Sequence, residues 1–224
     1  MADAALRVAL LGAECTGKTQ LAQALAPRLA RETGLRVTWV PEHLRLWCDQ
    51  VGRTPQAHEQ ASILRAQHER IEAAAATHDL VICDTTALMT AVYSRLIFAD
   101  RSLEPRAVLL QQRMAFTLLM AVDLPWEADG LQRDGEHVRE PVDKALRELL
   151  IARRLPWAVV GGAGPARLDN AVDALAPLWR RRAGPEQGLF SRLGGRHAAS
   201  AQPRLACDCC SVPVCERALR PPRA

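Results

Sequence analysis

Aromatic residues are scarce in this sequence and lysine is almost missing. Phenylalanine, tryptophan and tyrosine make up 4% of the 224 residues, so leucine, alanine and valine must fill any core. Arginine supplies every basic side chain except Lys18 and Lys144. The formal net charge is only +4, and no long basic run is present. This composition does not favour a nucleic-acid partner.

Long apolar runs are also missing. No segment approaches the roughly 20 residues that a membrane-spanning helix needs, so we expect no membrane partner. Asp3 precedes a short apolar run, which is typical of the entry to a strand rather than of a signal peptide. The seven cysteines are an odd number and cannot all pair within the chain. These features predict a cytoplasmic protein with reduced thiols, and they do not indicate an oligomeric state.

The pattern of the first 183 residues predicts one α/β domain. Hydrophobic residues make up 49% of the chain, and short apolar runs alternate with helical patterns. This alternation favours a parallel sheet with helices on both faces. We expect strands at 6–11, 36–40, 80–83, 116–122 and 157–160. Helices are expected from about residue 18 to 33, where Gly34 would end the first one, and then at 55–77, 86–99, 105–113, 142–154 and 168–182.

The composition changes after this domain. Residues 184–206 are small and polar and contain glycine and proline, so they are interpreted as a linker. Residues 207–224 form a short tail in which four of the seven cysteines lie within nine positions.

The strongest motif follows the first expected strand. Residues 12–19 read G-A-E-C-T-G-K-T and fit G-x-x-x-x-G-K-[ST] at every fixed position, with a helical pattern directly after them. In such a phosphate-binding loop, backbone N–H groups and a helix N-terminus face the phosphates of a nucleotide. The motif predicts a P-loop that binds the phosphates of ATP or GTP through Gly12, Ala13, Glu14, Cys15, Thr16, Gly17, Lys18 and Thr19.

Two carboxylates follow expected strands, where open α/β sheets bind ligands. Asp84 has the position of the aspartate that holds Mg²⁺, together with the Thr19 hydroxyl. Glu42 follows the second strand and is a candidate general base toward a small-molecule substrate. Arg45 lies three residues further on, where it can pair with Glu42 or contact a substrate phosphate. The expected catalytic residues are therefore Lys18 of the P-loop and the two carboxylates Glu42 and Asp84.

A polar segment after the fourth strand holds Trp126, Asp129, Gly130, Arg133 and Arg139. In phosphoryl-transfer enzymes a segment at this position can close over the phosphates and bring an arginine to the developing charge. Arg133 is the candidate catalytic arginine. The alternative is a solvated surface loop.

Four segments together resemble the NadR-like P-loop family, whose members include ribosylnicotinamide kinase domains. They are LLGAECTGKTQLA, WVPEHLRLW, VICDTTALMTAVY and LPWEADGLQRDG, and the resemblance covers roughly residues 6–180. It implies a fold of the nucleoside and nucleotide kinase type with Mg-ATP as the phosphoryl donor. It places Glu42 and Arg45 in an E-x-x-R element, Asp84 and Thr85 in a D-T element, and Trp126, Asp129 and Gly130 in a W-x-x-D-G element. The resemblance implies substrate contacts from the last two of these elements.

The chain departs from the family pattern on the acceptor side. His43 and Leu44 stand where an aromatic and a small residue are usual, and Arg133 is displaced by one position. Nicotinamide riboside is therefore the acceptor by analogy alone.

The cysteine-rich tail has two interpretations. Cys207 and Cys210 have the spacing of a zinc knuckle, and Cys215 could add a third thiolate. The alternative is a flexible tail with exposed thiols.

The motifs predict phosphoryl transfer, and together with the resemblance they imply an ATP-dependent kinase of a small nucleoside-like acceptor. An NTP-dependent regulatory protein without a metabolite acceptor is the second hypothesis. Glu42 favours the kinase, because a switch needs Asp84 but has no evident use for Glu42.

Overall fold

A five-stranded sheet organises the described part of the chain. The computed structural model describes residues 4–127 and 135–182, with the backbone alone for 180–182. All strand pairs are parallel, in the order β2-β3-β1-β4-β5. The strands are β1 (Leu6–Leu11), β2 (Val37–Val40), β3 (Leu80–Asp84), β4 (Phe116–Met120) and β5 (Trp157–Val160). The parallel α/β fold and the five expected strands are confirmed, with ends shifted by at most two residues.

Most of the expected helices are also present. The helices are α1 (Lys18–Thr33), α2 (His43–Val51), α3 (Gln60–Ala75), α4 (Ala87–Phe98), α5 (Glu104–Gln111), α6 (Arg139–Ala152) and α7 (Gly164–Arg182). Two 3-10 turns, η1 (Ala57–Glu59) and η3 (Glu136–Val138), precede α3 and α6. Gly34 ends α1 in the left-handed conformation, as expected.

One helix was not anticipated, and three others begin several residues from the expected position: α3 begins five residues later than expected, at Gln60, and α7 four residues earlier, at Gly164. α2 was not predicted as a helix at all, because it is short and only Cys48 is buried in it. α6 begins three residues earlier than expected, at Arg139, in a segment that its charges had marked as a loop.

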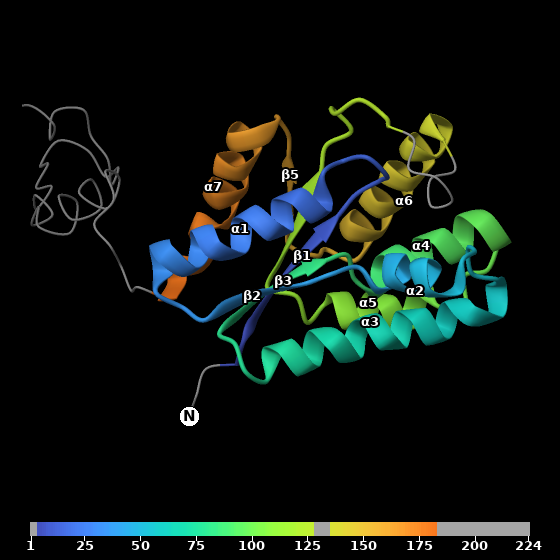
Figure 1. The fold of residues 1–224 in the computed structure, drawn as a ribbon, viewed down its shortest axis with the longest axis horizontal. Coiled ribbons are helices and arrows are strands. Elements are labelled where there is room, and N and C mark those ends of the chain that lie inside the picture. The colour runs from blue at the N-terminus through green and yellow to red at the C-terminus, as the bar shows by residue number, and fades with distance from the viewer. Residues whose placement is uncertain (1–3, 128–134, 183–224) are drawn as a thin grey trace, which may run out of the picture. The chain divides into compact units, whose positions relative to one another are not determined.

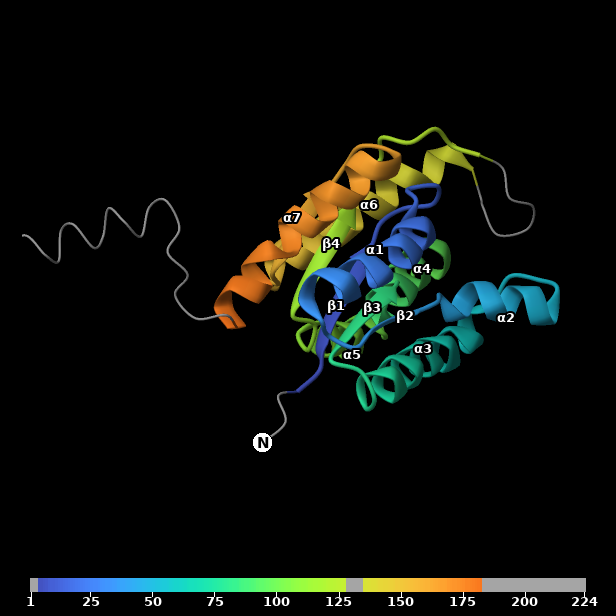
Figure 2. The same ribbon diagram turned by 60° about the vertical axis from the view of Figure 1, so that its left-hand side comes forward.

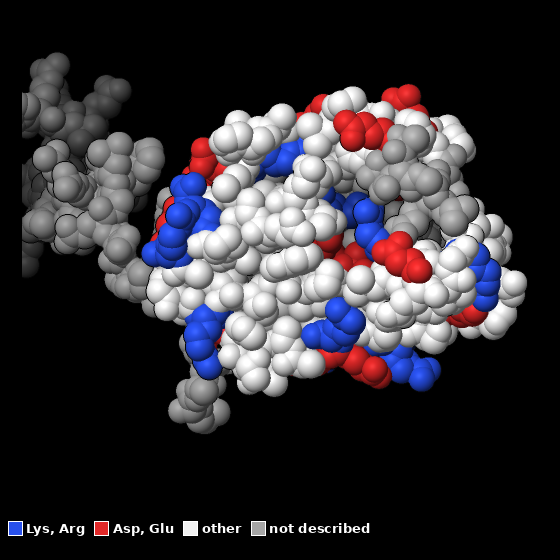
Figure 3. All heavy atoms as spheres, viewed as in Figure 1, with Lys and Arg blue, Asp and Glu red and all other residues white. Residues whose placement is uncertain are grey.

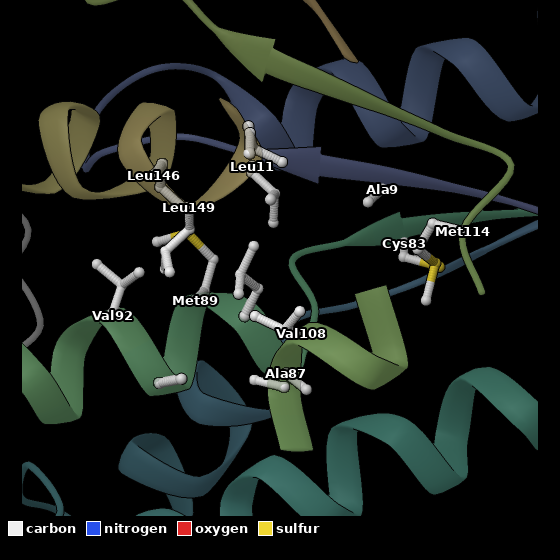
Figure 4. Close-up of a cluster of buried hydrophobic side chains, with 14 of the residues drawn as sticks. Ala9, Leu11, Cys83, Ala87, Met89, Val92, Val108, Met114, Leu146 and Leu149 are labelled. Atoms are coloured by element: carbon white, nitrogen blue, oxygen red, sulfur yellow. The ribbon is translucent and has the colours of Figure 1, made fainter. Parts of the chain in front are cut away.

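Helices lie on both faces of the sheet. α1 and α7 are on one side, where Arg28 of α1 reaches Asp169 of α7 at 3.4 Å, and α3, α4 and α5 are on the other (Figures 1 and 2). Strand side chains alternate between the two faces. Ala9 and Leu11 of β1 belong to a buried cluster with α4, α5 and α6, part of which is shown in Figure 4. Val8 and Leu10 are equally buried but lie outside that cluster, on the face of α1.

This double burial explains the continuous apolar strands seen in the sequence. β1 and β3 are fully buried at their carboxyl ends, so the residues that follow these strands are held at one edge of the sheet. The functional candidates of the sequence come from this edge.

The chain divides into two units, Met1–Leu178 and Trp179–Ala224. The predicted linker at 184–206 and the predicted zinc ligands Cys207, Cys210 and Cys215 lie outside the described residues. No helix in the described ranges is both long and apolar enough to cross a membrane.

Candidate active site

The loop between β1 and α1 has a conformation that depends on its glycines. Gly12 has φ +153°, and a Cβ there would lie 2.9 Å from the Cβ of Met120. Gly17 precedes α1 with φ +74°, a region that other residues rarely adopt. The Thr16 hydroxyl donates a hydrogen bond to the Ala13 carbonyl at 2.8 Å and closes the loop on itself. The backbone therefore turns sharply at both ends of the loop.

Lys18 lies inside this loop. Its Nζ donates hydrogen bonds to the carbonyls of Gly12, at 3.0 Å, and Ala13, at 2.9 Å. The ammonium is thus held above the loop at the N-terminus of α1, where its charge adds to the positive end of the helix dipole. An anion such as a phosphate would find a point charge and free helix N–H groups at the same place.

Thr19 and Asp84 meet beside the loop. The Thr19 hydroxyl donates a 2.6 Å hydrogen bond to Oδ2 of Asp84, the last residue of β3. Asp84 is only 1% exposed, and its Oδ1 is buried without a hydrogen-bond partner among the described residues. Burial raises the pKa of Asp84, while the bond from Thr19 and the charge of Lys18 oppose that rise.

An unsatisfied buried carboxylate oxygen next to a hydroxyl suits a hard divalent cation. Mg²⁺ prefers oxygen ligands and is commonly held by one or two side chains together with phosphates. Thr19 and Asp84 therefore fit the magnesium ligands expected from the sequence.

Glu42 lies on the neighbouring strand. β2 pairs with β3, Val40 opposite Cys83, so the residues after both strands emerge at the same edge. Glu42 occupies the N-cap position of α2 without a side-chain capping hydrogen bond, and Arg45 follows in the first turn of that helix. Burial raises the pKa of Glu42; the charges of Lys18 and Arg45 lower it, and that of Asp84 raises it. The two carboxylates and the lysine thus act on one another electrostatically.

Thr85 and Trp126 have a different placement from the one expected. Thr85 is 3% exposed and has φ +68°; its N–H donates to the Leu10 carbonyl at 3.1 Å. Its carbonyl accepts a 3.5 Å hydrogen bond from the Gln67 amide. Thr85 and the partly buried Trp126 do not line the cavity described below. Asp129, Gly130 and Arg133 lie outside the described residues.

Arg139, another arginine of the polar segment, is 4% exposed and belongs to α6. It donates a 2.8 Å hydrogen bond to the Leu124 carbonyl, so it fixes the segment after β4 rather than facing solvent.

Arg167 was missed by the sequence reasoning. It lies in the first turns of α7, is 4% exposed, and donates to the Thr16 carbonyl of the P-loop. It also pairs with Asp123 after β4 and donates to the Gly162 carbonyl after β5, at 2.6 Å. The only sequence signal was the glycine cluster at 161–164, which marks a turn at the same edge of the sheet.

A cavity of about 680 Å³ joins these features. Its lining includes the P-loop from Glu14 to Gln20, together with Glu42 and Arg45. Side chains of largely apolar character also line it, among them Leu44, Cys48, Pro55, Tyr93, Ile97 and Phe98. Acidic and basic side chains meet in a recess right of centre in Figure 3. The volume falls within the range of small-molecule sites.

A family model described as an AAA domain matches residues 7–167. The chain belongs to this family. The match includes the P-loop, both carboxylates and Arg167. No curated protein matches the sequence closely enough to count as a relative.

Solved structures show a similar fold. A NadR protein in complex with NAD and AMP-PNP has a TM-score of 0.60 and 20% identity, over 83% of this chain and 51% of that one. A NadR protein in complex with NR has a TM-score of 0.62 and 20% identity, over 82% and 52%. Thymidylate kinase from Ehrlichia chaffeensis has a TM-score of 0.56 and 14% identity, over 79% and 100%.

The chain thus spans about half the length of the NadR structures. At these identities the likeness establishes the fold. The resemblance to NadR-like P-loop proteins and the nucleotide-kinase type of the domain are therefore confirmed at that level.

Proposed function

We propose that the protein is an ATP-dependent kinase that phosphorylates a hydroxyl of a small nucleoside-like acceptor such as nicotinamide riboside. The observation that carries this proposal is the arrangement of Glu42 and Asp84. Asp84 ends β3 and Glu42 follows the adjacent parallel strand β2, and the charge of Lys18 in the P-loop acts to lower the pKa of both carboxyl groups. The cavity that contains the P-loop is also lined by Glu42 and by apolar side chains of α2 and α4, which offer surface to the ring of an acceptor.

The residues divide between donor and acceptor. Lys18 would leave its carbonyl partners to contact the β- and γ-phosphates, and the loop N–H groups would bind the same oxygens. Thr19 and Asp84 would hold Mg²⁺, which neutralises charge on the phosphates when it is bound. Arg45 also lines the cavity, where it can orient Glu42 or the acceptor.

Glu42 would accept the proton of the acceptor hydroxyl. The hydroxyl oxygen then forms a bond to the γ-phosphorus, and the bond between that phosphorus and the bridging oxygen breaks to release ADP. Burial raises the pKa of Glu42, so the carboxylate holds a proton more tightly than an exposed glutamate. A general base with a raised pKa is better matched to proton transfer near neutral pH.

The test is a screen of ribonucleosides, including nicotinamide riboside, for acceptor-dependent ADP release. Glu42→Gln is expected to retain Mg-ATP affinity and to lose turnover by about a hundredfold or more, the scale of a lost general base. Glu69→Gln is the control, because Glu69 is exposed on α3 and lies outside the cavity.

Turnover that survives in Glu42→Gln would make Glu42 structural. ATP binding without phosphorylation of any acceptor in the wild-type protein would favour the second hypothesis, an NTP-dependent regulatory or partner-binding protein.

A further inference from the structure

Among the residues that line the cavity is a buried polar side chain that the proposed reaction does not use. Gln60 is the first residue of α3, is 2% exposed, and lines the cavity. Its Oε1 is buried and has no hydrogen-bond partner among the described residues. Buried polar atoms of this kind are rare in folded proteins and lower stability unless something pairs with them.

Two other buried glutamines show what a structural role looks like in this molecule. Gln67 accepts from the His43 N–H at 2.6 Å and donates to the Thr85 carbonyl at 3.5 Å. Gln111 accepts from the Thr86 hydroxyl at 2.6 Å and donates to the Thr117 hydroxyl at 2.9 Å. Both amides are satisfied at each end by the protein. Gln60 differs in that its oxygen has no protein partner while its side chain borders the cavity.

The chemistry of an amide defines the partner. A glutamine side chain presents an acceptor oxygen beside a donor NH₂, and the two can exchange places by a half turn. A planar group with a donor beside an acceptor satisfies both ends in either orientation. Tyr93 and Phe98 line the same cavity and offer flat apolar surface to such a group.

We propose that Gln60 is the specificity-determining residue for the acceptor, and that it selects a planar ring bearing an amide, either as a carboxamide substituent or as part of the ring. The amide end would lie at Gln60, and the reacting hydroxyl would lie at Glu42 in the same cavity. This inference rests on the proposed kinase function.

Binding of matched acceptor pairs tests the assignment. The full-length protein with Mg-AMP-PNP is titrated calorimetrically with nicotinamide riboside and nicotinic acid riboside, and with uridine and 3-methyluridine. The second member of each pair lacks the amide N–H. The wild-type protein is expected to prefer the intact amide in at least one pair by about tenfold or more, the scale of an unpaired buried polar group. The pair that shows the preference tells a carboxamide from a ring amide.

Gln60→Met keeps the size of the side chain and removes the amide. We expect the preference to fall below about threefold, with AMP-PNP affinity unchanged and the melting temperature unchanged or higher, because an unpaired polar atom is removed. Gln111→Met is the matched control: it breaks two satisfied hydrogen bonds away from the cavity. It should lower the melting temperature and keep the preference.

A preference that persists in Gln60→Met would overturn the assignment, as would a melting temperature that falls as far as that of Gln111→Met. Acceptor-dependent ADP release is measured separately. Selective binding without phosphorylation would reject the kinase and keep the role of Gln60. Phosphorylation of an acceptor together with an unchanged preference in Gln60→Met would support the kinase and reject the role of Gln60. Absence of acceptor binding would reject both the kinase and the role of Gln60.

Discussion

At the scale of single residues, Lys18 carries the clearest prediction. It lies in the P-loop, and the chain has one other lysine, Lys144, exposed on α6. Lys18→Ala is expected to weaken Mg-ATP binding at least about a hundredfold without unfolding the domain, because the ammonium is the main side-chain charge toward the phosphates. Calorimetric titration measures the affinity, and Lys144→Ala serves as the control. Equal affinities in both variants would remove the P-loop assignment.

Asp84 links function to stability. Its pKa is raised by burial, so its charged form costs folding free energy. The protonated carboxyl avoids this cost, so the corresponding stability is present at low pH and is lost as pH rises through the folded-state pKa of Asp84. Asp84→Asn should therefore melt at a higher temperature than the wild type at neutral pH while losing Mg²⁺-dependent ATP binding. The difference in melting temperature should shrink as pH falls.

Asp100 provides a control of opposite sign. Hydrogen bonds from the backbone N–H and hydroxyl of Ser102 lower the pKa of Asp100. Its contribution to stability is present at neutral pH and is lost as pH falls through the lowered pKa. Asp100→Asn should therefore melt at a lower temperature than the wild type at neutral pH. If both variants change in the same direction, the assignment of the Asp84 environment is wrong.

At the scale of elements, Arg167 ties three segments together at the carboxyl edge of the sheet. It connects the P-loop at Thr16 with Asp123 after β4 and Gly162 after β5. Arg167→Ala should lower the free energy of unfolding by roughly 2 kcal/mol or more, because it removes a buried guanidinium and its partners. The Asp123 side chain that loses its partner is 37% exposed, so water can solvate it. The loss in free energy of unfolding therefore stays below the full cost of an isolated buried charge.

Urea unfolding measures this loss, and Mg-ATP titration should show a parallel loss of affinity. Arg36→Ala is the control: Arg36 pairs with Asp79 on the surface with 68% of its side chain exposed, so its loss should cost less than about 1 kcal/mol. Equal costs for the two arginines would show that Arg167 does not hold the loop.

The elements also show how far sequence reasoning extends. Both ends of β1 and of β5 were predicted correctly, because an apolar run bounded by turn residues determines where a strand begins and ends. α2 escaped prediction because only Cys48 is buried in it. The P-loop and Asp84 follow from local spacing. Arg167 and Gln60 do not, since their roles depend on which loops the strand order brings together.

At the scale of the whole molecule, residues up to Glu127 line the cavity, and the core of unit Met1–Leu178 contains its own buried cluster. A protein truncated after Arg182 should therefore fold cooperatively and keep its affinity for Mg-ATP. If Cys207, Cys210 and Cys215 bind zinc, only the full chain should carry about one equivalent of metal. Loss of ATP affinity on truncation would show that the second unit contributes to the site. Absence of zinc from full-length protein purified under reducing conditions would leave the exposed-thiol interpretation.

The strand order has a consequence for how the chain is made. β1 is the central strand of the sheet and is synthesised before the other four strands, yet its partners come late: Leu6 pairs with Leu80, and Val8 with Phe116. Contacts between residues so distant in sequence form slowly, because the entropy of closing a long loop is lost before the contact contributes favourable free energy. β1 therefore has no strand partner until β3 has been synthesised, and one of its two edges stays unpaired until β4 follows. Nascent chains halted before residue 116 should depend on chaperones to stay free of aggregates.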